Sequence, residues 1–199
     1  HIDGVLKAPR SFEHIAPQAV GNLRNMIISS LSGRSAMVEK MARILPHLDR
    51  ESPEVAAALE AVREKEEAGY SYDDGEASLL LVIREALGMR NQYFQVPHFK
   101  VMTDEGGGKE EDMRSTAMIK VSVGGVEELC AAEGIGPVNA MDKALRQALV
   151  RFYPAIDQMH LTDFKVRVIS GGATAAVVRV VIESTDGVAV WRTVGVSPD

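Results

Sequence analysis

Apolar residues recur at helical spacing through the first half of the chain. One predicted helix covers 35–45, where Pro46 ends a stripe made of Met37, Val38, Met41, Ile44 and Leu45. A second begins at Ser52-Pro53, with Ser52 as N-cap and Pro53 at the first helical position. A third covers 75–87 and ends at Gly88. The first half is therefore predicted to be a small helical unit.

From Phe99 onward the period changes from helical to two. The pattern predicts strands at 99–103, 115–123 and 126–132, with a loop at 106–108 and a tight turn at Gly124-Gly125. An amphipathic helix from Pro137 to Phe152 follows, and its apolar side is expected to cover one face of these strands. Asp142 and Arg146 form a favourable i,i+4 pair on its other side.

The strand pattern then begins again. Strands are predicted at 161–169, 175–184 and 188–196, joined at Gly171-Gly172 and at the hairpin signal Asp186-Gly187. The second half therefore predicts strand-strand-strand-helix followed by strand-strand-strand, with the last helix apparently missing. Such a sheet leaves apolar surface exposed, so we expect that a C-terminal helix was cut away or that a partner chain covers the sheet.

These elements predict an α+β fold in three sections. Residues 1–23 form a connector, 24–92 a mainly helical linker subdomain, and 93–199 a two-layer domain built from repeated βββα units. The chain starts at His1 rather than methionine, which suggests an excised fragment.

Charge and composition narrow the classes of partner and compartment. A net charge of −6 and a pI near 5.4 argue against nucleic acid or an anionic membrane as the main partner. The longest apolar run, 79–83, is too short to span a bilayer, and no signal-peptide pattern is present. The single cysteine, Cys130, cannot form an internal disulfide and has apolar neighbours, so we expect a buried structural thiol in a cytoplasmic protein.

The stretch AEGIGPVNA at 132–140 joins the predicted third strand to the amphipathic helix. Pro137 suits a first helical position, and the free backbone donors there, next to Gly134 and Gly136, suit a small anion such as a carboxylate. A dinucleotide fingerprint is rejected, because Asn139 replaces the third glycine and no parallel βαβ unit is present. A plain strand-to-helix turn without a ligand remains open.

The sequence contains no catalytic set. Its five histidines are scattered, no metal-ligand spacing occurs, and no phosphate loop or nucleophile elbow is present. No metal site is therefore predicted in this chain.

Several motifs occur in the order of a known family. AEGIGPVNA at 132–140, LTDFKVRV at 161–168 and TVGVS at 193–197 resemble the C-terminal regulatory domain of the 2-isopropylmalate and citramalate synthases. HIDGVLK at 1–7 is similar to the end of that family's catalytic barrel, and LSGR at 31–34 to its linker. EKEEAGY at 64–70 and the stretch 76–88 resemble the long bacterial citramalate synthases more than ordinary isopropylmalate synthases.

The resemblance implies a parent acyltransferase that condenses acetyl-CoA with a 2-keto acid in a metal-dependent barrel of the same polypeptide. The divalent metal and acetyl-CoA are expected in that barrel and no cofactor in this fragment, which is expected to be inactive. His1 matches a family histidine near the active site and is the one auxiliary catalytic candidate. Phe12 stands where relatives often carry a tyrosine.

The resemblance also implies feedback inhibition by a branched-chain amino acid at a homodimer. One wall of the effector pocket is carried over to Gly134, Ile135, Gly136, Val138 and Asn139, and the other to Ala173, Ala175 and Ala176. Isoleucine suits a citramalate synthase and leucine a 2-isopropylmalate synthase. A structural dimerisation module without an effector is the alternative.

Overall fold

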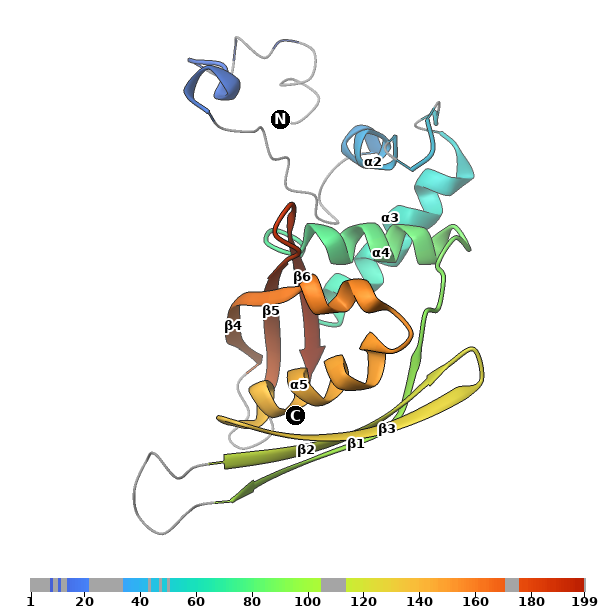
Figure 1. Cartoon of the computed structure of the whole chain (residues 1–199). Coiled ribbons are helices and arrows are strands. Elements are labelled where there is room, and N and C mark those ends of the chain that lie inside the picture. Colours follow the sequence, from blue (N-terminus) through green and yellow to red (C-terminus); the bar gives the residue numbers. More distant parts are fainter. Residues whose placement is uncertain are drawn as a thin grey trace. The chain divides into compact units, whose positions relative to one another are not determined.

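The structure is a computed structural model of the chain, and it describes residues 8, 11, 14–21, 34–42, 44–46, 48–49, 51–104, 114–170 and 176–198. Their packing divides the chain into two compact units, one made of 1–90 with 161–199 and the other of 91–160 (Figure 1). The predicted sections 1–23, 24–92 and 93–199 stay a prediction, because packing units and functional domains need not share boundaries.

Helices make up the first part of the first unit. Those that the structure describes are the 3-10 helix η2 (Pro17–Val20) and the α-helices α2 (Arg34–Met41), α3 (Pro53–Glu67) and α4 (Glu76–Ala86). α3 begins at Pro53 as predicted, but the Ser52 hydroxyl donates to the Asp49 carbonyl at 2.5 Å and makes no side-chain cap bond. The three α-helices share one core, whose largest fully buried members are Met37, Met41, Val55, Val62, Leu79 and Ile83.

The same unit contains the later antiparallel sheet. Its strands β4 (His160–Ser170), β5 (Val177–Thr185) and β6 (Val190–Ser197) lie in the order β4-β5-β6. The predicted hairpin between β5 and β6 is confirmed, and Asp186 Oδ1 accepts hydrogen bonds from the N–H groups of Val188 and Ala189 at 2.9 and 2.7 Å. Those backbone bonds hold the pKa of Asp186 below its usual range.

One face of this sheet packs against the helices, which corrects the expectation that it lacks cover. Val194 of β6 is 8% exposed and belongs to the helical core, with Val181 of β5 packed against it. The Ser78 hydroxyl of α4 accepts a hydrogen bond from the Val194 N–H at 2.9 Å, so the helix also satisfies one backbone group on the outer edge of β6. The opposite face keeps exposed apolar side chains, as expected: Phe164, Val166 and Val168.

The second unit is a sheet with one helix on it. Strands β1 (Gln95–Asp104), β2 (Arg114–Val123) and β3 (Val126–Gly134) pair antiparallel in the order β1-β2-β3, and α5 (Pro137–Val150) lies along them (Figure 1). The short 3-10 helix η4 (Pro154–Gln158) follows. Strand alternation places Ala117, Ile119 and Val121 under the helix, where they pack with the fully or nearly buried Ala140, Ala144, Ala148 and Leu149.

Arg146 connects the C-terminal part of α5 to the segment that follows the helix. Arg146 Nε donates to Asp142 Oδ2 at 2.9 Å, which confirms the predicted pair, and its Nη1 donates to the carbonyls of Ile156 (3.0 Å) and Met159.

The α+β class and the strand triplets are confirmed. Cys130 is half-buried rather than fully buried, because it faces α5 from the outer strand β3.

Candidate functional site

The loop between β3 and α5 is shaped by a close approach at Gly134. A Cβ at this buried glycine would lie 2.5 Å from the backbone N and 2.8 Å from the Cα of Ala140. The side chain of Asn139 then turns back, and its Oδ1 accepts the Ile135 N–H at 3.2 Å. Glycine is therefore needed at position 134 so that the strand can pack against the helix, and the Asn139 hydrogen bond fixes the conformation of the loop.

Backbone donors gather at the start of α5. Gly136 is the N-cap with φ 85° and no side-chain cap, and the first intrahelical bond runs from Ala140 N to Gly136 O at 3.2 Å. Pro137 has no N–H, so the N–H groups of Val138 and Asn139 precede that first bond and lie at the positive end of the helix dipole. This arrangement suits a carboxylate.

Apolar side chains and one cation surround these donors. Ile135 is 90% exposed and Val138 45% exposed, while Lys143 Nζ reaches the Glu133 carbonyl at 3.2 Å. Backbone donors and apolar side chains therefore lie next to each other on an exposed surface. An enclosed ligand pocket here would need a second wall from another segment.

The other sequence-predicted positions are only partly described. Ala176 is half-buried just before β5. Ala173, Ala175, His1 and Phe12 lie outside the described residues, so the second wall and the auxiliary histidine stay predictions.

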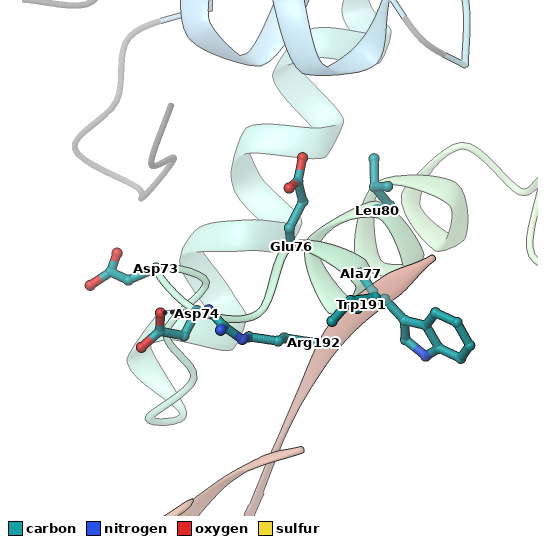
Figure 2. Close-up of a pocket in the computed structure, with 8 residues that line it drawn as sticks. Asp73, Asp74, Glu76, Ala77, Leu80, Trp191 and Arg192 are labelled. Carbon is teal, nitrogen blue, oxygen red and sulfur yellow. Dashed lines mark ion pairs between the residues drawn. The ribbon is translucent and has the colours of Figure 1, made fainter. Parts of the chain in front are cut away.

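A cavity of about 330 Å³ lies in the first unit, between the start of α4 and β6 (Figure 2). Its lining consists of Asp73, Asp74, Glu76, Ala77, Leu80, Val190, Trp191 and Arg192. Arg192 reaches toward Asp74, with Nη1 3.6 Å from Oδ1, whereas the Trp191 ring points away from these charges (Figure 2). Sequence reasoning did not single out this cavity, because its two sides lie more than a hundred residues apart.

Arg192 and Glu76 of this cavity also form ion pairs with neighbouring residues. The Arg192 guanidinium donates through Nε to Glu183 Oε2 at 2.8 Å, and its Nη2 lies 2.7 Å from the same oxygen. This hydrogen bonding lowers the pKa of Glu183 and raises that of Arg192. Glu76 Oε1 lies 2.5 Å from Lys40 Nζ. The carboxylates thus complement Arg192, Lys40 and the positive end of α4, and the cavity is a salt-bridged joint between helix and sheet.

A catalytic or metal site is not visible in the part of the chain that the structure describes. No group of three or more His, Cys, Asp or Glu side chains there is placed to hold a metal ion. Burial, and secondarily Glu128, raises the pKa of the Cys130 thiol, which disfavours the reactive thiolate.

Comparison with known proteins identifies the family. Residues 75–199 match the family described as the LeuA allosteric (dimerisation) domain. The chain is 42% identical over 198 residues to an (R)-citramalate synthase of Geobacter sulfurreducens and 42% identical over 200 residues to one of Aquifex aeolicus. In both cases 99% of this chain aligns but only 37% of the relative, so the chain spans about a third of these proteins. A Synechocystis (R)-citramalate synthase is also 42% identical, over 200 residues. The resemblance found in the sequence motifs is confirmed, and the chain belongs to the LeuA allosteric (dimerisation) domain family.

Proposed function

We propose that this chain is the linker and effector-sensing region of a citramalate synthase that binds isoleucine and is thereby feedback-inhibited. The main support is the 42% identity that extends over 99% of the chain to (R)-citramalate synthases. The catalytic barrel belongs to the same polypeptide, with residues 1–23 as the connector, and there a divalent metal and acetyl-CoA take part in condensation. The fragment itself does not catalyse this condensation.

The effector site is assigned to the start of α5. The N–H groups of Val138 and Asn139 receive the amino-acid carboxylate, and Ile135 and Val138 contact the branched side chain. The family resemblance assigns the second wall to Ala173, Ala175 and Ala176, which are small residues that would leave space for the branched side chain. Leucine in place of isoleucine is the second candidate, and it corresponds to a 2-isopropylmalate synthase.

The working assembly is a cytoplasmic homodimer. The match to a family described as a dimerisation domain supports this assembly. Ile135 beside the backbone donors is 90% exposed, which suits a site completed by a second subunit. No described helix is long and apolar enough to cross a bilayer, and the acidic charge balance disfavours nucleic acid.

Asn139→Asp tests the location of the effector site. The new carboxylate keeps the acceptor for the Ile135 N–H and suits a helix N-terminus, so the fold is retained. It repels the effector carboxylate, however, and we expect at least a tenfold weaker isoleucine affinity by calorimetric titration of the chain, a loss of about 1.4 kcal/mol. Asn91→Asp makes the same charge change away from the loop and serves as the control.

The outcomes separate the candidate functions. Isoleucine binding that Asn139→Asp leaves intact would place the site elsewhere. Tighter binding of leucine than isoleucine would support the second candidate. A dimer whose melting temperature is unchanged by either amino acid would instead indicate a purely structural dimerisation module, because ligand at about 100 times its Kd adds roughly 2.7 kcal/mol of stability.

A further inference from the structure

A second, smaller cavity lies on the helix-facing side of β4 and β5. Three cationic side chains line it, Lys165 and Arg167 from β4 and Arg179 from β5. The turn before α4 closes the cavity with Ser71, Asp73 and Asp74. We propose that this cavity binds a small oxyanion such as inorganic phosphate. The proposal does not depend on the amino-acid effector.

The three cations keep donors available. Arg179 Nε donates to the Gly69 carbonyl at 2.7 Å, which fixes its guanidinium and leaves its two terminal nitrogens for a ligand. Lys165 Nζ lies 3.4 Å from Asp163 Oδ2 in an exposed pair. Arg167 makes no hydrogen bond or ion pair with any residue that the structure describes. Arg167 is two residues from Lys165 in β4, so strand alternation places both side chains on the same face of the sheet.

The side chains that line the cavity favour an anion. Lys165, Arg167 and Arg179 exceed the lining carboxylates Asp73 and Asp74 by one positive charge, and the exposed Asp163, which pairs with Lys165, is not part of the lining. Asp74 is also turned toward Arg192, whose Nη1 lies 3.6 Å from its Oδ1 (Figure 2). Asp73 is the main opposing charge, so its removal is expected to strengthen anion binding.

The size of the cavity suits one small group. Its volume is about 100 Å³ and it is partly open to solvent, so a group of the size of one phosphate fits. Guanidinium groups bind the oxygens of a phosphate or carboxylate through paired N–H donors, and the Ser71 hydroxyl adds a neutral donor. A bound oxyanion would join the α3–α4 turn to β4 and β5 and stabilise the first unit.

Calorimetric titration of the whole chain with phosphate, at constant ionic strength and without amino acids, tests the proposal. We expect one phosphate per chain, at least a tenfold higher Kd for Arg167→Gln, and a lower Kd for Asp73→Asn. Arg114→Gln makes the same charge change in the other unit, at a side chain that is 74% exposed, and should leave the Kd unchanged. Acetate and sulfate titrations distinguish a carboxylate from a tetrahedral dianion.

Thermal unfolding followed by Trp191 fluorescence supplies a second measurement. Phosphate also stabilises proteins by exclusion from their surface, so the readout is the difference between the wild type and Arg167→Gln, not the shift itself. Equal phosphate affinities of the wild type and Arg167→Gln, or no binding by both the wild type and Asp73→Asn, would overturn the proposal. Loss of isoleucine binding would contradict the proposed effector function alone.

Discussion

At the residue scale, the two loop glycines are constrained for different reasons. Gly134 is limited by space, since its Cβ would meet the backbone of Ala140 at 2.5 Å. Gly136 is limited by its φ of 85°, and a Cβ there would meet nothing within 4 Å. The first constraint belongs to packing between β3 and α5, and the second to the local turn.

Gly134→Ala is expected to destabilise the chain more than Gly136→Ala. Backbone atoms cannot move aside as a flexible side chain can, so we expect a loss of about 2–4 kcal/mol at position 134, against about 1–2 kcal/mol at 136. Thermal unfolding by far-UV circular dichroism measures both, because Trp191 lies in the other unit. An equal or reversed order would contradict the close approach.

Tyr72 carries a buried hydroxyl that has no hydrogen-bond partner among the described residues, and it is 3% exposed. Tyr72→Phe removes this unpaired polar group, so we expect unchanged stability or a gain of up to about 1 kcal/mol in denaturant unfolding.

Burial also raises the pKa of Tyr72 above its usual range. Above about pH 10 the unfolded state alone ionises, so wild-type stability should fall more steeply with rising pH than that of Tyr72→Phe. Parallel pH profiles would show that the hydroxyl is hydrated.

At the element scale, α4 joins three parts of the first unit. Glu76 in its first turn pairs with Lys40 of α2. Ser78 bonds the outer edge of β6, and Leu79, Val82 and Ile83 enter the helical core. The same helix thus serves as core, ion-pair partner and sheet cover.

Glu76→Gln is expected to cost more stability than Lys40→Met. The first change leaves Lys40, whose side chain is 9% exposed, as an uncompensated cation, whereas the second removes the buried charge and keeps an apolar stem. Glu76 is 41% exposed, so water reduces the loss to about 1–2 kcal/mol, below the value for a fully buried pair. Urea unfolding followed by Trp191 fluorescence measures the order. A greater loss for Lys40→Met would mean that the ion pair itself stabilises the unit.

At the scale of the whole molecule, the described residues form two sheets of the same strand order with different covers. The β1–β3 sheet is covered by α5, the helix that follows it in sequence, and the β4–β6 sheet by α4, which precedes it. The free face of the second sheet keeps Phe164, Val166 and Val168 exposed at 46–64%. The repeat pattern predicted exposed apolar surface on this sheet, and the structure confines it to the face that α4 does not cover.

The sequence by itself determined the elements, since helical and alternating periodicities and turn residues such as Asp186-Gly187 act over a few positions. It also located the start of α5 as an anion-compatible loop, because Pro137 and the flanking glycines are local signals. Only the tertiary structure decided that α4 covers the second sheet, that Asn139 closes its loop, and that Arg167 and Arg179 line one cavity with Ser71. Those contacts join residues that are distant in sequence or depend on side-chain direction, so no local pattern specifies them.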